Sequence, residues 1–198
     1  MFENKRLVED REDLTEAYLL EKLKGFSNIL QLEYLEKLNK RDTLLPGIKV
    51  LVCKKISEIY EGRNLYALAA SSLKPAIGHV VLAKEKKELL LKLGTLWIKA
   101  GELLSSADAF NDALKIESPS EVRNLQKHIR GIYLNEASSL EKIGKMAKAS
   151  VIYERMLKYP QEGENTDEIK TKLANLYKKL GKVTESLNLM NSMKPIKK

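Results

Sequence analysis

The chain has 198 residues, of which 43% are hydrophobic and 31% are charged, and its formal net charge is +8 at pH 7. No stretch approaches the roughly 18 consecutive apolar residues that a membrane-spanning helix requires, so we expect no transmembrane segment. The single cysteine, Cys53, excludes a framework of intrachain disulfides, and the charged start MFENKRLVEDRED does not resemble a secretory signal. We therefore expect a cytoplasmic protein.

The positive charge is concentrated toward the C-terminus. Residues 1–45 carry 8 basic and 10 acidic side chains, residues 46–120 carry 11 and 8, and residues 121–198 carry 16 and 9. The net charges of these three segments are therefore −2, +3 and +7. Such an excess attracts acidic proteins, nucleic acid or anionic lipid, but it also serves simply to keep a surface hydrated.

The first 86 residues show two weak helical-hairpin patterns. In residues 14–38, apolar side chains recur at helical spacing on both sides of a turn at Gly25. A second pattern covers residues 56–73, with Asn64 as the turn residue. Residues 1–86 are expected to form either degenerate repeats that continue a helical stack or a separate capping bundle.

Residues 87–120 carry the clearest pattern. Apolar residues recur at helical spacing before and after Gly101, and a glycine there can adopt the positive φ that ends a helix without steric cost. Gly94 and Ser106 are small because two helix axes approach closely only where side chains are short. The segment is predicted to be a pair of antiparallel helices.

The same pattern returns at residues 121–163 and 164–198, with turns at Gly144 and Gly181. The segment SPSE predicts that the first helix of the 121–163 repeat starts at Ser118. Self-similarity of this kind is typical of helical repeat proteins. We predict an all-α antiparallel helix-hairpin array of about ten helices, arranged as one continuous stack. The expected close-approach residues of the last two repeats are Ala137, Ala149, Ala174 and Ser186.

These three repeats resemble tetratricopeptide repeats, which have a small residue, an aromatic residue or leucine, and a turn glycine at matching positions. The resemblance covers residues 87–198 and implies a right-handed superhelix. The turn glycines lie 43 and 37 residues apart, whereas the family repeat has about 34 residues. Long, irregular hairpins of this kind are also similar to the arrays of the soluble NSF attachment proteins.

The residues that could carry catalysis are few. The two histidines, His79 and His128, are 49 residues apart, and no paired cysteines accompany them as zinc ligands. Cys53 precedes two lysines that could lower its pKa, but free cysteines are more often buried and inert. No phosphate-binding loop, dinucleotide fingerprint or nucleophile elbow is present. We therefore expect no enzymatic activity, no cofactor and no metal site.

Binding is the expected function, because stacked hairpins present a concave surface lined by the first helix of each repeat. Chaperone-tail-binding members of the tetratricopeptide family hold a terminal carboxylate with a Lys/Asn/Arg clamp. Only Asn175 matches that clamp, so this particular activity is not expected. The residues predicted to line the concave face are Thr95, Ile98, Lys99, Leu134, Ser138, Lys142, Thr171, Asn175, Lys178 and Lys179.

Three functions follow from these observations. The first is a non-enzymatic protein–protein interaction module or scaffold that binds a peptide or helix of a partner on the concave face. The second is a protein associated with nucleic acid or an anionic surface through its basic C-terminal third. The third is a noncatalytic subunit of a larger assembly, and a homodimer is also compatible with the apolar residues of the last helix.

Overall fold

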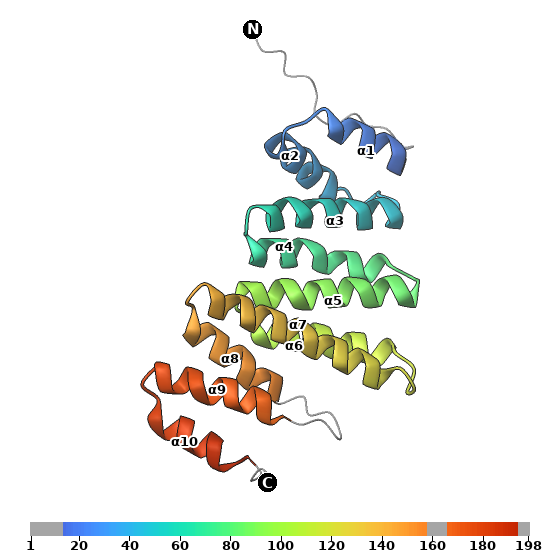
Figure 1. The fold of residues 1–198 in the computed structure, drawn as a ribbon. Helices are drawn as coiled ribbons and strands as arrows, with labels where there is room; N and C mark the ends of the chain where they lie inside the picture. Colours follow the sequence, from blue (N-terminus) through green and yellow to red (C-terminus); the bar gives the residue numbers. More distant parts are fainter. Residues whose placement is uncertain (1–13, 158–165, 194–198) are drawn as a thin grey trace. The chain divides into compact units, whose positions relative to one another are not determined.

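The computed structural model describes residues 14–157 and 166–193, and all regular secondary structure within these ranges is helical. The predicted all-α architecture is confirmed: the described residues form ten α-helices and one short 3-10 helix (Figure 1). The handedness of a superhelix stays a prediction.

The chain packs as two compact units, Met1–Ala100 and Gly101–Lys198. The predicted division fell between residues 86 and 87, whereas helix α5 (Ala83–Ala100) packs on α4 and on the 3-10 helix that precede it. The structure therefore groups α5 with the N-terminal helices. We call the two parts the N-terminal unit and the C-terminal unit.

The N-terminal unit places its helices beside one another in chain order. Helix α2 packs on α3, α3 on α4, and α4 on α5. A cluster of buried leucine, isoleucine and valine side chains, together with Tyr34, joins the first three helices. The elements are α1 (Glu16–Lys24), α2 (Asn28–Asn39), α3 (Pro46–Gly62), α4 (Tyr66–Leu73), the 3-10 helix η1 (Lys74–His79) and α5.

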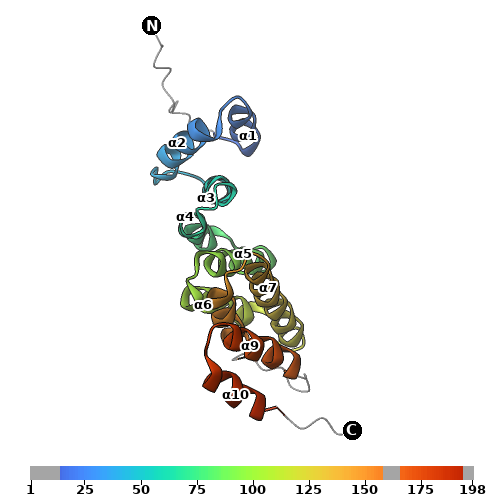
Figure 2. The same cartoon turned by 60° about the vertical axis from the view of Figure 1, so that its left-hand side comes forward.

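The C-terminal unit follows the same plan, with successive helices in contact from α6 to α10 (Figures 1 and 2). Phe110 and Tyr133 are completely buried and meet edge to face, with ring centroids 5.4 Å apart. Tyr153 is also completely buried. The elements are α6 (Leu103–Ile116), α7 (Val122–Lys142), α8 (Met146–Leu157), α9 (Asp167–Lys179) and α10 (Val183–Asn191).

Four of the five predicted turn residues have positive φ. The values are 60° at Asn64, 90° at Gly101, and 76° at both Gly144 and Gly181. Gly25 also lies between two helices, but its φ of −80° is right-handed, so that turn needs no glycine for conformational reasons. The predicted turn positions are thus confirmed.

The turn at Gly181 shows how these reversals are held. The Gly181 N–H donates to Lys178 O at 3.2 Å, and the Lys182 N–H donates to Tyr177 O at 2.8 Å. This pair of bonds defines a Schellman motif, which satisfies carbonyls that a helix end otherwise leaves unpaired. The α3–α4 and α7–α8 turns contain the same pair of bonds.

The small residues lie where helices approach each other, as predicted. Ala137, Ala149 and Ala174 are completely buried. The Ser186 hydroxyl of α10 donates to Ala174 O of α9 at 2.8 Å, which is direct evidence of a close approach. Larger side chains at these positions would push the helices apart.

The predicted helix start at Ser118 is wrong. Helix α7 begins at Val122, and Ser118 instead starts a turn in which its carbonyl accepts from the N–H groups of Glu121 and Val122. The helix is nevertheless unusually long for the array, at 21 residues.

Replacing Gly144 with alanine tests the turn geometry. A Cβ at positive φ costs roughly 1–2 kcal/mol, so Gly144→Ala should lower the free energy of unfolding by about that amount. The control is Gly131→Ala, inside α7, where a Cβ would meet no atom within 4 Å. This control should raise the free energy of unfolding by about 0.5–1 kcal/mol. Urea unfolding measures both, and equal stability of the two variants would contradict the turn geometry.

Candidate functional site

The three predicted binding residues of α5 are largely engaged within the N-terminal unit. Ile98 is only 3% exposed, so its inclusion in an accessible face was wrong. Thr95 is half-buried, and its hydroxyl donates to Leu91 O of its own helix at 2.8 Å. Lys99 Nζ lies 3.3 Å from Glu61 Oε1. Of the three, only Lys99 is exposed, and its ammonium group is paired with Glu61 of the same unit.

The predicted residues of the C-terminal unit divide into two groups. Leu134 and Ser138 are half-buried, and Ser138 Oγ lies 3.4 Å from the Tyr153 hydroxyl, so their side chains turn toward the packed side of α7. The other five are exposed and supply the candidate site: Lys142, Thr171, Asn175, Lys178 and Lys179.

The outer face of α7 contains residues that the sequence analysis did not select. They recur at helical spacing on the side opposite the buried residues, and they line a shallow hollow that includes Gly131, where an added Cβ would meet no atom within 4 Å. The spacing of asparagine, histidine, glycine and asparagine along this helix was the available signal. The lining residues are Asn124, Lys127, His128, Gly131, Ile132 and Asn135.

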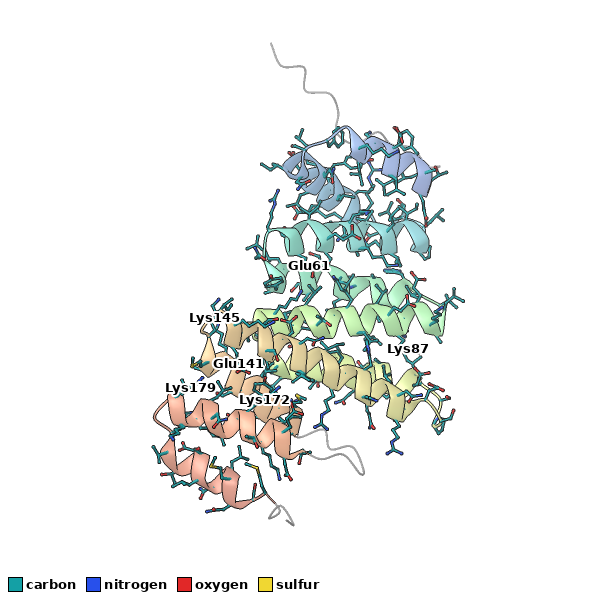
Figure 3. The ribbon with its side chains drawn as sticks, in the orientation of Figure 1. Glu61, Lys87, Glu141, Lys145, Lys172 and Lys179 are labelled. Carbon is teal, nitrogen blue, oxygen red and sulfur yellow. The ribbon has the colours of Figure 1, made fainter. Side chains whose placement is uncertain are left out.

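Six exposed lysines surround the two turns of the C-terminal unit, and we call them the basic edge. Because α8 reverses the chain, the C-terminal ends of α7 and α9 lie at the same end of the unit. Figure 3 shows Lys145 and Lys179 at this end, whereas Lys172 lies nearer the start of α9. The basic edge comprises Lys142, Lys145, Lys148, Lys178, Lys179 and Lys182.

Among the described residues, none of these six ammonium groups forms an ion pair with a carboxylate. Lys182 instead lies over the Tyr177 ring, 5.5 Å from its centroid. The C-terminal ends of α7 and α9 carry partial negative charge, which stabilises nearby cations and offsets some of their mutual repulsion. The edge is therefore a surface of exposed lysines that form no ion pair with the described carboxylates.

Glu141 of α7 and Glu154 of α8 each accept a hydrogen bond from a tyrosine, whereas Glu185 of α10 is exposed three residues after Lys182. The Tyr153 hydroxyl of α8 donates to Glu141 of α7 at 2.5 Å. The Tyr177 hydroxyl of α9 donates to Glu154 of α8 at 2.7 Å. Each bond ties two successive helices together, and each leaves one carboxylate less available to the lysines.

These two hydrogen bonds contribute to a raised pKa at both tyrosine hydroxyls. Burial and the hydrogen bond to Glu141 raise the pKa of Tyr153 to about 12. Burial and the hydrogen bond to Glu154 raise the pKa of Tyr177 to about 12 in the same way. Both phenols therefore stay protonated, and act as donors, well above neutral pH.

In the N-terminal unit, three lysines form ion pairs between α3 and α5. Lys54 of α3 pairs with Glu85 of α5 at 2.6 Å, and Glu61 of α3 pairs with Lys92 and Lys99 of α5. Burial acts to raise the pKa of Glu61, but hydrogen bonds and charge from the two lysines outweigh it and lower that pKa. These ion pairs join α3 to α5 within the N-terminal unit.

The residues considered for catalysis are not assembled into a site. Cys53 is completely buried, as one of the two interpretations expected, and burial raises the pKa of its thiol despite the opposing charge of Lys49. His79 and His128 are both exposed. Within the described ranges, no cluster of three or more histidine, cysteine, aspartate or glutamate side chains has a metal-binding arrangement.

No family model matches the sequence, and no curated protein matches it. Among solved structures, the chain is similar to the crystal structure of BtubC (BKLC) from P. vanneervenii. The two are 15% identical over 93% of this chain and 96% of that chain, with a TM-score of 0.37. A TM-score this low supports no inference about function. In the part of the chain that the structure describes, no helix has the length and apolar character needed to cross a bilayer.

The tyrosine–glutamate bonds predict a loss of stability at alkaline pH. An unfolded tyrosine ionises near pH 10, whereas Tyr153 and Tyr177 hold their protons in the folded chain to about pH 12. The unfolded state therefore binds fewer protons between these values, and the free energy of unfolding should fall as pH rises through them. Denaturant unfolding across this range should show a shallower fall in the double variant Tyr153→Phe/Tyr177→Phe. An unchanged slope would contradict the assignment.

Proposed function

We propose that the chain is a non-enzymatic interaction module whose C-terminal unit binds an acidic peptide segment of a partner protein. The observation that carries the proposal is the basic edge, where six exposed lysines have no carboxylate partner among the described residues. An acidic segment would supply the missing counter-charge. The resemblance to tetratricopeptide repeats also supports it, because arrays of helical hairpins commonly present surfaces to peptides.

The exposed face of α9 gives the peptide a place to lie beside the charge. Asn175 presents an amide that can both donate to and accept from a peptide backbone. The Thr171 hydroxyl donates to Asp167 O at 2.7 Å, which leaves its oxygen able to accept a further bond. The hollow around Gly131 on α7 would admit one protruding side chain of the partner. Such a module would act as an adaptor or scaffold in the cytoplasm.

Nucleic acid is the second candidate, because the same charge attracts phosphate. Two observations favour the peptide. The basic edge contains lysine only, whereas arginine is preferred for bidentate phosphate contacts. Within the described part of the C-terminal unit, the aromatic side chains are buried or half-buried, so none offers an open ring on which a base could stack.

A charge reversal tests the proposed site. The probe is a fluorescein-labelled glutamate-rich peptide, measured by fluorescence anisotropy against a glutamine-rich peptide of equal length. The variant Lys142→Glu/Lys178→Glu/Lys179→Glu should weaken binding of the acidic probe at least about tenfold, equal to about 1.4 kcal/mol. Affinity of the unchanged chain should also fall as salt rises, because the lysines are exposed.

A matched control separates the site from a general effect of net charge. It reverses the same number of exposed lysines in the N-terminal unit and should leave affinity within about twofold. Equal loss in both variants would contradict the site. Binding of a DNA duplex with a steep salt dependence, and no binding of the acidic peptide, would favour nucleic acid instead. The control variant is Lys40→Glu/Lys74→Glu/Lys84→Glu.

A further inference from the structure

The last helix of the C-terminal unit has an uncovered apolar face. In Figures 1 and 2, α10 lies at the outer end of the unit, beside α9. Ser186 is its one buried residue. Val183, Leu187 and Met190 are 57%, 54% and 45% exposed, and their i, i+4, i+7 spacing places them on one stripe. We call these three residues the α10 stripe.

The equivalent positions of α8, one hairpin earlier in the chain, differ from the α10 stripe in their burial. Counted from the turn glycines, Leu187 corresponds to Ser150 of α8, and Met190 corresponds to Tyr153. Ser150 is 1% exposed and Tyr153 is completely buried, so this side of α8 is covered. The equivalent positions of α10 are apolar but open.

Helix α9 is packed against α8 and therefore serves as a template for the missing neighbour. It is amphipathic: Ile169, Leu173 and Leu176 are buried, whereas Thr171 and Asn175 face solvent. A helix of this type, seated on α10 as α9 is seated on α8, would cover the α10 stripe. The contact would repeat a packing arrangement that the unit already contains.

We propose that the α10 stripe binds an amphipathic helix of a partner protein, antiparallel to α10 and with carboxylates near its C-terminal end. The orientation copies that of α9 on α8. It brings the C-terminal end of the incoming helix beside the start of α10, where Lys179 and Lys182 are exposed. Acidic side chains at that end would be complementary in charge to the basic edge.

Charge also distinguishes this occupant from a second copy of the chain. Residues 101–198 carry 17 basic and 13 acidic side chains, a net charge of +4, so pairing two C-terminal units through α10 would bring like charges together. An acidic helix from another protein meets no such repulsion. The α10 stripe itself contains no residue of the basic edge, although a helix bound there would share Lys179 and Lys182 with the acidic peptide.

The α9 sequence itself supplies a probe. It is a synthetic peptide of residues 166–180 carrying Lys178→Glu and Lys179→Glu, added to the isotopically labelled full chain and followed by NMR chemical-shift changes. Backbone signals of Val183–Asn191 should shift, and Leu187→Asp should weaken the affinity at least about tenfold. The control Asn188→Asp, which adds the same charge at an exposed position of the same helix, should change it by less than about twofold.

Three outcomes would overturn the proposal. One is the absence of shifts in α10, and another is equal weakening by Leu187→Asp and Asn188→Asp. The third is a concentration-dependent dimer in sedimentation velocity that Leu187→Asp abolishes, because the stripe would then belong to a second copy. Leu187 is exposed, so its replacement should leave the fold intact. Binding of the glutamate-rich peptide by Leu187→Asp measures the basic edge separately, so each site can fail without the other.

Discussion

The reversal of the chain at a left-handed residue is the constraint on which the rest of the C-terminal unit depends. Gly144 and Gly181 end α7 and α9 with the same pair of backbone hydrogen bonds, and each starts a helix that returns along the one before it. Because the motif repeats, the C-terminal ends of α7 and α9 lie at one end of the unit. The lysines next to each of these two turns are therefore brought to the same end of the unit. Together they form the basic edge.

The tyrosine–glutamate bonds explain why this edge keeps its charge. Glu61 and Glu141 both lie three residues before a turn residue, yet they are used differently. Glu61 pairs with two lysines of α5, whereas Glu141 accepts the hydroxyl of a buried tyrosine. The Glu141 carboxylate keeps its negative charge, but its hydrogen bond goes to Tyr153 and to no lysine of the turn. The same type of residue thus stabilises packing in one unit and screens charge in the other.

Periodicity predicted the architecture well because it reports on backbone and burial. The turn glycines and the close-approach alanines follow from sterics that act within a few residues, and the structure places them as expected. The accessible face was harder to predict, because successive residues of a helix differ by about 100° in direction. An error of that size placed Ile98 and Ser138 on the surface when one is buried and the other faces Tyr153. The pairing of Glu61 with Lys92 joins residues 31 apart and depends on tertiary contacts that periodicity does not contain.

A helix at the outer end of a repeat array has one face that no neighbouring helix covers. Whether that face favours binding depends on whether its residues are polar or apolar. Polar residues on the open side would hydrate it, as expected of a terminal repeat that acts as a cap. Helix α10 instead carries valine, leucine and methionine on one exposed stripe, and the positions of α8 that match Leu187 and Met190 are buried. Exposed apolar side chains scattered singly are ordinary, whereas three on one stripe beside uncompensated lysines combine the two features that an acidic amphipathic helix recognises. The α10 stripe therefore has the chemistry of a surface on which a further helix packs.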